Sequence, residues 1–274
     1  MATTGTDFQH IELQRHAHIA VITLQRPDRL NALNRQMGLE LHAILDQLAG
    51  EFPETRVVII TGAGRGFCSG ADVGDMAKRM ADPTDGDLGA SPSADQGPSI
   101  IMRLAPHLRA IPQPVIAAVN GVAAGAGLGI ALSCDIRVAS DEARFTSVFV
   151  KRSLMPDAGV SQILGAVAGP GIAAEMALTG RVYDAQWALA KGLVNQVVSA
   201  GELMSQAESL AQEIAGNPPL AVRATKKLLN SHYPDLSQVI EAEHRANDAI
   251  RDTADQEEAV RAFVEKRDPK FTGS

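Results

Sequence analysis

Two turns rich in small residues decide the fold of this chain: Cys68-Ser69-Gly70-Ala71-Asp72 and Asn120-Gly121-Val122-Ala123-Ala124-Gly125-Ala126-Gly127. Each turn follows a short apolar run typical of a buried strand, residues 57–60 before the first turn and residues 115–119 before the second. Each turn also precedes a segment that can form a helix. The two turns are therefore predicted to join a buried strand to a helix, with little side-chain bulk at the junction.

Such turns leave backbone N–H groups open to a ligand. Glycine and alanine let another group approach the backbone, and N–H groups at a helix start lack an intrahelical acceptor and carry partial positive charge. One N–H group from each turn would hold a single oxygen atom from two sides. The pattern predicts an oxyanion hole, which stabilises the negative charge that develops on a carbonyl oxygen during a reaction.

The composition is that of a globular protein. The 274 residues are 45% hydrophobic, enough for one large domain or for one domain with a helical appendage. A net charge of −7 argues against nucleic acid and against an anionic membrane surface as partners. Two cysteines and a polar start without a visible secretory leader favour a cytoplasmic location. Residues 115–132 are long and weakly polar, but Asn120-Gly121 interrupts them, so no membrane span is expected.

Hydrophobic periodicity predicts an α/β fold with largely parallel sheets, because strands and helices alternate over the first two hundred residues. An amphipathic helix is expected to end at Gly50, and the polar residues 82–98 predict a loop. After residue 200 the pattern is helical, with breaks at Pro218-Pro219 and at Pro234. The expected strands are residues 8–13, 19–24, 57–60, 115–119, 136–139 and 193–198.

Further segments extend the pattern of the two turns over nearly the whole chain, from about residue 8 to residue 271. These segments are Arg26-Pro27, Asn31-Ala32-Leu33-Asn34, residues 61–72, residues 111–121, Cys134-Asp135, Leu178-Thr179-Gly180, Gly192-Leu193-Val194 and residues 262–267. In this order they resemble the crotonase family, which is the enoyl-CoA hydratase/isomerase superfamily. Taken together the segments are highly specific for that family.

The resemblance implies a crotonase-like spiral of ββα units at residues 1–200, which would hold an acyl-CoA site. Residues 201–274 would form a helical region for oligomerisation, giving a homotrimer or a dimer of trimers. The implied substrate is an acyl-CoA thioester of fatty acid metabolism, with no cofactor besides the CoA of the substrate. The residues show no cluster with metal-ligand spacing, so no metal is expected.

The resemblance also assigns site residues by position. The N–H groups of Ala71 and Ala126 would be the two donors of the oxyanion hole. A second group would bind CoA: Ala32, Ser69 and Asp72 along the pocket, Arg29 toward the phosphates, and Phe263 and Lys266 at the adenine and phosphate end. Charge-assisted contacts from these cations would offset the negative net charge of the chain.

The chain departs from the pattern of enoyl-CoA hydratases, which carry two catalytic glutamates. The first glutamate position falls on Gly129 and the second on Phe149. Instead, Asp157 stands where some relatives place a single catalytic carboxylate, among them the ring-epoxide isomerases of phenylacetyl-CoA catabolism and the chlorobenzoyl-CoA dehalogenases. The tail at residues 262–273 also looks closest to the ring-epoxide isomerases. Apolar neighbours such as Met155 are expected to raise the pKa of Asp157.

An isomerase with Asp157 as its acid and base is therefore predicted, because moving a double bond needs one proton shuttle whereas adding water uses two carboxylates comfortably. Alternatives remain open: a hydratase, a dehalogenase with Asp157 as nucleophile, or an acyl-CoA-binding protein without activity. Asp157 could instead cap a helix, and the alanine turns could serve packing alone. Two weaker hypotheses remain. One is a nucleophile elbow at Cys68. The other is a dinucleotide-binding motif G-x-G-x-x-G beginning at residue 62 or 125, but Phe67 and Ile130 stand where its last glycine is required.

Overall fold

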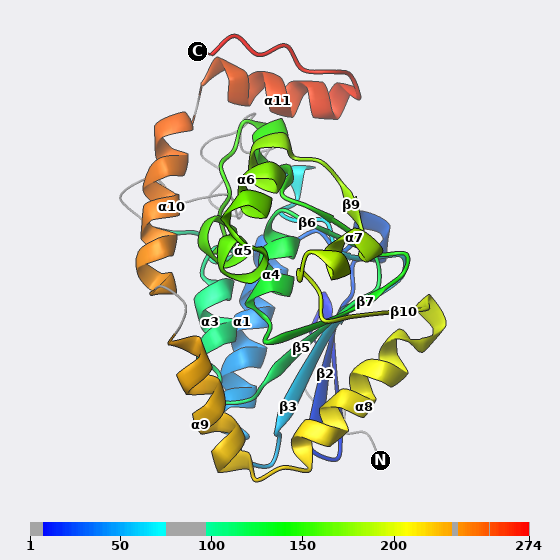
Figure 1. The fold of residues 1–274 in the computed structure, drawn as a ribbon. Helices are drawn as coiled ribbons and strands as arrows, with labels where there is room; N and C mark the ends of the chain where they lie inside the picture. Colours follow the sequence, from blue (N-terminus) through cyan, green and yellow to red (C-terminus); the bar gives the residue numbers. More distant parts are fainter. Residues whose placement is uncertain (1–7, 75–96, 232–234, 252, 274) are drawn as a thin grey trace.

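The computed structural model describes residues 8–74, 97–231, 235–251 and 253–273 (Figure 1). The loop expected at 82–98 lies outside these residues as far as residue 96. Within the described ranges, no helix is both long and apolar enough to cross a membrane. Strands and helices alternate up to residue 200, which confirms the α/β prediction.

The larger sheet has six strands in the order β1-β2-β3-β5-β7-β10. The expected hairpin forms its antiparallel edge, and every other neighbouring pair is parallel. The two central strands, β3 and β5, are buried at every position, as apolar runs of parallel strands should be. The strands are β1 (Ile11–His16), β2 (Ile19–Leu24), β3 (Val57–Gly62), β5 (Val115–Val119), β7 (Ile136–Ser140) and β10 (Gln196–Val198).

Two strands differ clearly from the expectation: β1 covers residues 11–16 instead of 8–13, and the later start of β10 has a physical reason. β10 begins at residue 196 instead of 193, because Leu193 still belongs to the end of the preceding helix α7 (Ala185–Ala190). The Leu193 N–H group donates to the carbonyl oxygen of Ala188 at 2.8 Å, and the Leu193 side chain is buried there. The apolar run at residues 193–198 therefore contains both the end of a helix and the start of a strand. The periodicity of its apolar residues does not show where one stops and the other begins.

A smaller sheet, which the sequence did not reveal, brings the two turns together. Its strand order is β4-β6-β8-β9, with β9 antiparallel to β8 and the other pairs parallel. Strand β4 contains the start of the first turn and β6 lies within the second, so the two turns are hydrogen-bonded neighbours. These strands are β4 (Gly66–Cys68), β6 (Val122–Ala124), β8 (Arg144–Thr146) and β9 (Tyr183–Asp184).

Different helices cover the two faces of the larger sheet. On one face lie α1 (Arg35–Gly50), α3 (Leu104–Ala110) and α4 (Ala126–Ser133), which share a core with side chains such as Ile60. The predicted helix α1 ends at Gly50, and Asn34 caps its start by accepting from the Met37 N–H group at 2.9 Å. On the other face α8 (Leu203–Ala215) packs against β3, β5 and β7.

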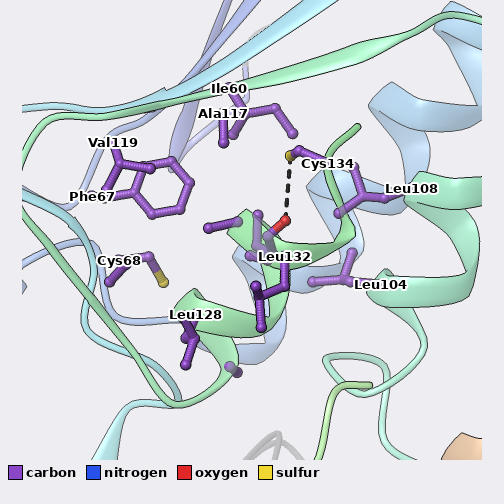
Figure 2. Packing of buried hydrophobic residues seen from close by; sticks show 14 of the residues in the cluster. Ile60, Phe67, Cys68, Leu104, Leu108, Ala117, Val119, Leu128, Leu132 and Cys134 are labelled. Carbon is purple, nitrogen blue, oxygen red and sulfur yellow. Dashed lines mark hydrogen bonds between the residues drawn. The ribbon is translucent and has the colours of Figure 1, made fainter. Parts of the chain in front are cut away.

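Helix α4 is buried at every residue. A helix that is apolar on all sides belongs inside a core, and Figure 2 shows Leu128 and Leu132 of α4 among side chains such as Phe67 and Leu104. The N-terminus of α4 directly follows Gly125, so the core holds the second turn in place. The position of this turn is therefore fixed by the close packing of the core around α4.

The described residues after 200 are mostly helical, as predicted, and most of these helices pack against the rest of the chain. Helix α10 (Leu236–Ile250) packs against α3 and α5, and α11 (Ala254–Glu265) packs against η3 (Val148–Arg152). Figure 1 shows α9 (Pro219–Asn230) and α10 along one side of the molecule and α11 across one end. The remaining elements are η1 (Pro27–Arg29), α5 (Val160–Ala168), α6 (Pro170–Thr179) and η4 (Ala200–Glu202).

Replacing Gly127 tests how far the fold depends on backbone contact between the turns. A Cβ atom at Gly127 would lie 2.1 Å from the carbonyl oxygen of Cys68, so Gly127→Ala must push the two turns apart. We expect it to lower the free energy of unfolding by about 1–3 kcal/mol, as overpacking does. Urea unfolding measures the change.

The matched control is Gly171→Ala in α6, where a Cβ atom meets nothing within 4 Å. Alanine favours a helix over glycine by about 1 kcal/mol, so this variant should be as stable as the parent or more stable. Equal stability of the two variants would contradict the importance of the contact at Gly127.

Candidate active site

The two small-residue turns meet backbone to backbone. A Cβ atom at Gly70 would lie 2.9 Å from the carbonyl oxygen of Ala124 and 3.5 Å from the nitrogen of Ala126. Gly70 and Gly125 also have φ values of +97° and +52°, which glycine adopts without strain. Glycine is required here for both space and backbone direction, and the result is that Ala71 and Ala126 lie on facing turns.

The N–H groups of Ala71 and Ala126 have no backbone acceptor in the described part of the chain. Two bonds flank Ala71: Leu33 N–H donates to the Gly70 carbonyl at 2.8 Å, and Asp72 N–H donates to the Leu33 carbonyl at 2.9 Å. Ala126 is the first residue of α4, where N–H groups lack an intrahelical partner. The structure thus leaves both predicted donors available to a ligand oxygen.

The side chain of Asp72 holds the first turn in shape. Its Oδ2 atom accepts from Arg26 Nη2 at 2.9 Å, and its Oδ1 atom accepts from the Gly74 N–H group at 3.0 Å. Arg26 in turn donates to the carbonyl oxygen of Ala32. The Asp72 carboxylate, assigned to the CoA pocket by the resemblance, therefore has intramolecular partners that fix the backbone around Ala71.

The other residues assigned to CoA fall into two groups. Arg29 is exposed on η1, and the Ser69 hydroxyl donates to the Arg29 carbonyl at 3.3 Å, so these residues and Ala32 surround the first turn. Phe263 and Lys266 lie at the end of α11, both exposed. The guanidinium of Arg152 lies 4.4 Å from the centre of the Phe263 ring, which attaches this end of α11 to η3.

Asp157 lies in the turn between η3 and α5 and is partly buried. Burial raises the pKa of Asp157 to about 7, the charge of Glu243 raises it further, and a hydrogen bond from Asn247 opposes the shift. Asn247 Nδ2 donates to Asp157 Oδ2 at 3.5 Å. A carboxyl group with a pKa near neutrality is present in both protonation states and can accept a proton and return it.

The alternative role of Asp157 as a helix cap is wrong. Helix α5 has Gly159 at its N-cap and no cap from its own sequence. Asp157 contributes only its backbone carbonyl, which accepts from the Val160 N–H group at 3.0 Å. The cap comes from α10, where Glu243 accepts from the N–H groups of Gly159 and Ser161. The Asp157 carboxyl group is thus not used by the helix.

The positions that carry glutamate in hydratases are filled differently here. A Cβ atom at Gly129 would lie 2.7 Å from the carbonyl oxygen of Ala158 and 3.1 Å from its Cβ atom. Phe149 is buried, and its ring lies 3.8 Å from a Cβ atom built at Gly125. The turn that carries Asp157 therefore occupies the space that a side chain at residue 129 would need.

Neither cysteine is a nucleophile. Cys68 and Cys134 are fully buried free thiols, and burial raises the pKa of each to about 12 (Figure 2). A thiol with such a pKa stays protonated at neutral pH and is a poor nucleophile. The reading of Cys68 as a nucleophile elbow is therefore wrong.

A cavity of about 340 Å³ lies beside the Asp157 turn, between α5 and α10. Its lining includes Met155, Gln162, Val239 and Glu243, but neither Ala71 nor Ala126, so it is separate from the proposed oxyanion hole. Over the described residues, no group of three or more His, Cys, Asp and Glu side chains could hold a metal ion.

Glu243 and Asn247 are site residues that the sequence reasoning missed. They lie on the buried face of α10 together with Leu236 and Ile240, at helical spacing. The signal was present, because two polar residues interrupt an apolar stripe at its centre. No role in the site was predicted for these residues, because the resemblance implies that residues 201–274 serve oligomerisation.

Comparisons with known proteins agree with this geometry. The family model for enoyl-CoA hydratase/isomerase matches residues 14–274. The chain is 38% identical over 256 residues to a putative enoyl-CoA hydratase of Thermus thermophilus, covering 93% of this chain and 97% of that protein. It is 39% identical over 259 residues to the 1,2-epoxyphenylacetyl-CoA isomerase of Escherichia coli, covering 93% and 95%. The chain belongs to the enoyl-CoA hydratase/isomerase family.

The fold of this enoyl-CoA hydratase/isomerase family member is the crotonase fold. A crystal structure of an enoyl-CoA hydratase from Mycobacterium avium subsp. paratuberculosis superposes with a TM-score of 0.84 at 31% identity, covering 97% of this chain and all of that one. The protein is thus an enzyme of this family. The names of its relatives include both hydratases and an isomerase, so they do not decide between the two reactions.

Replacing Ala126 tests the second donor of the oxyanion hole. Proline is tolerated at the first position of a helix, so Ala126→Pro should fold while removing only the N–H group. We expect the rate of reaction of an acyl-CoA thioester to fall by about 10²–10³, the usual effect of losing one such donor. Ala126→Gly keeps the N–H group and should stay active; a fully active Ala126→Pro enzyme would contradict the assignment.

Proposed function

We propose that this enzyme is an acyl-CoA isomerase that stabilises the enolate of its thioester substrate and uses Asp157 as its single acid and base. The reaction is a double-bond shift in an enoyl-CoA or the isomerisation of a ring-epoxide thioester. No cofactor besides the CoA of the substrate takes part, and the setting is cytoplasmic.

One observation carries the proposal: the turn that packs through Ala158 against Gly129 carries a carboxyl group, Asp157, with a pKa near 7, while positions 129 and 149 hold no carboxylate. Double-bond migration needs one group that takes a proton from one carbon and returns it to another. With a pKa near 7, Asp157 can accept a proton as a carboxylate and donate one as a carboxylic acid. Hydration needs a second group to activate water, and the two usual positions for it are occupied by glycine and phenylalanine.

In the proposed reaction, the Asp157 carboxylate removes a proton from C2 of a 3-enoyl thioester. The electron pair moves onto the thioester oxygen, where the N–H groups of Ala71 and Ala126 stabilise the negative charge of the dienolate. The protonated Asp157 then delivers a proton to C4, which leaves the double bond between C2 and C3. A ring-epoxide thioester would use the same stabilisation of negative charge on its thioester oxygen.

Hydration is the second candidate, because several relatives are named as hydratases and because α10 brings a second carboxylate, Glu243, next to the Asp157 turn. A panel of acyl-CoA esters tests both reactions, together with ring rearrangement. We expect double-bond migration or ring rearrangement to exceed the addition of water to crotonyl-CoA. Water addition at a comparable rate would contradict the proposed isomerase, and complete absence of α-proton exchange would indicate a binding protein.

We also propose that the CoA part of the substrate runs from the first turn toward α11. Arg29, Ala32 and Ser69 would lie along the pantetheine and phosphates, and Phe263 and Lys266 would contact the adenine end. Two observations support this path. Arg29, Phe263 and Lys266 are exposed, and Ala32 and Ser69 lie at the first turn. The positive charges of Arg29 and Lys266 also suit the phosphates of CoA.

A trimer, or a dimer of trimers, completes the proposal. Helix α9 exposes three leucines, Leu220, Leu228 and Leu229, each 60% or more accessible, and apolar surface of this kind is typical of protein contacts. Light scattering at micromolar concentration should give three or six times the mass of one chain. A stable monomer under these conditions would overturn this part of the proposal.

Asp157→Asn tests the proton shuttle. Asparagine keeps the shape of the side chain but has no basicity, so exchange of substrate α-protons with deuterated solvent should fall by roughly 10² or more. In the parent enzyme the exchange rate should rise with pH and level off above about 7, since the carboxylate is the active form and burial raises the pKa of Asp157 to about 7. Near-normal exchange in the variant would show that Asp157 is structural.

The same variant has a stability signature of known sign. The pKa of Asp157 is raised from 3.8 to about 7 in the folded state, so ionisation of this group opposes folding. The cost is absent below pH 3.8, grows as the pH rises toward 7 and is complete above it. Asp157→Asn should therefore be more stable than the parent at pH 8, with a smaller difference at pH 5, as judged by urea unfolding.

A further inference from the structure

Helix α10 places a buried carboxylate against the turn that carries Asp157. Glu243 is only 2% exposed, and its neighbours on the same face of α10 include Ile240 and Asn247. A buried charge is costly unless hydrogen bonds compensate it. The partners of Glu243 therefore indicate what the residue does.

Both oxygen atoms of Glu243 bind backbone N–H groups at the start of α5. Glu243 Oε2 accepts from Gly159 at 3.0 Å, and Oε1 accepts from Ser161 at 3.3 Å. The first N–H groups of a helix need an acceptor, and Gly159 has no side chain to supply one. Glu243 supplies the missing cap from another helix, and its negative charge suits the positive end of α5.

The turn held in this way is strained. Ala158 and Gly159 are both left-handed, with φ values of +52° and +80°, and a left-handed alanine is unfavourable without external support. On one side, Ala158 packs against the backbone at Gly129. On the other side, α10 binds the turn at two points, through Glu243 after Ala158 and through Asn247 at Asp157 itself. Helix α10 thus holds both ends of the strained segment.

We propose that Glu243 is a positioning residue for Asp157: from α10 it caps α5, holds the left-handed turn in shape and sets the charge beside the Asp157 carboxyl group. The proposal rests on the proposed function, in which Asp157 moves the proton. Glu243 itself touches no reacting atom in this account, because both of its oxygens are engaged by N–H groups.

The other charged groups of η3 and α10 contact residues other than Asp157 or are exposed to solvent. On α10, His244 Nε2 lies 3.5 Å from Asp248 Oδ2, and Asp248 Oδ1 lies 2.6 Å from Arg251 Nη2. On η3, Arg152 lies over the Phe263 ring. Helix α5 and helix α4 carry no charged residue. Glu243 is the charged group that acts on the pKa of Asp157, and it raises that pKa.

Two substitutions separate the support of the turn from the charge. Glu243→Gln removes the charge and leaves one carbonyl acceptor, whereas Glu243→Asp keeps the charge but is one methylene too short to reach both N–H groups. The control is Glu241→Gln, an exposed residue of the same helix. All variants are compared with the parent in α-proton exchange as a function of pH, in KM for the same acyl-CoA, and in amide hydrogen exchange at Gly159 and Ser161.

We expect Glu243→Gln to shift the midpoint of the pH profile downward by about 1 unit, since a like charge has been removed. Glu243→Asp should keep the midpoint while its exchange rate falls about tenfold or more, because Asp157 is displaced. KM should stay unchanged in both variants, and the amides of Gly159 and Ser161 should exchange faster. Glu241→Gln should match the parent in every measurement.

Unchanged amide exchange, rate and midpoint in both Glu243 variants would overturn the proposal. Loss of water addition to crotonyl-CoA with intact α-proton exchange would also overturn it, because Glu243 would then be a second catalytic acid or base. A parent enzyme without α-proton exchange would refute the proposed function alone. In that case amide exchange, together with the Asp157 pKa measured by carboxyl carbon NMR, still decides whether Glu243 supports and tunes the turn.

Discussion

Direct backbone contact between two turns is the constraint on which the rest of this structure depends. Gly127 lies against the carbonyl of Cys68, and Gly70 lies against the carbonyl of Ala124, at distances that leave no room for a Cβ atom. This contact is possible because the short strands β4 and β6 pair and because the core holds α4 on all sides. As a consequence the N–H groups of Ala71 and Ala126, which have no backbone acceptor among the residues that the structure describes, lie on facing turns.

The backbone conformation and the carboxyl groups around Asp157 lower the free energy of unfolding, and the packing of the core compensates for this loss. A left-handed alanine costs about 1–2 kcal/mol, and a carboxyl group with a pKa near 7 is one whose ionisation opposes folding. Glu243 adds a like charge close to it, and hydrogen bonds from the start of α5, among them the N–H groups of Gly159 and Ser161, compensate this charge. These unfavourable features persist because contacts from several surrounding elements fix the conformation of the turn. They are typical of sites whose chemistry needs a strained backbone or a shifted pKa.

The sequence predicted the central strands, α1 and the two turns, because each is marked by a long apolar run or by glycines that only a tight turn requires. It could not predict β4, β6 and β8, since three residues are too few to show a period and these strands exist through pairing with each other. Glu243 was missed for a related reason. A helix stripe shows which residues are buried, but whether the covering surface is the same chain or another subunit depends on the tertiary fold.

In the proposed function, a carboxylate at Asp157 takes the place of the one that the resemblance to hydratases puts at residue 129. The backbone of Ala158 occupies the space beside residue 129, so a long side chain there and this turn exclude each other. The proposed base therefore lies at the end of a turn held by α10, and the proposed donors are the N–H groups of Ala71 and Ala126 on the two facing turns. In the proposed reaction the charge on the thioester oxygen is stabilised in the same way, and the reach of the base selects the carbon atoms between which the proton moves. Because that reach is set by the turn, the residues that hold the turn determine the reaction as much as the carboxylate itself.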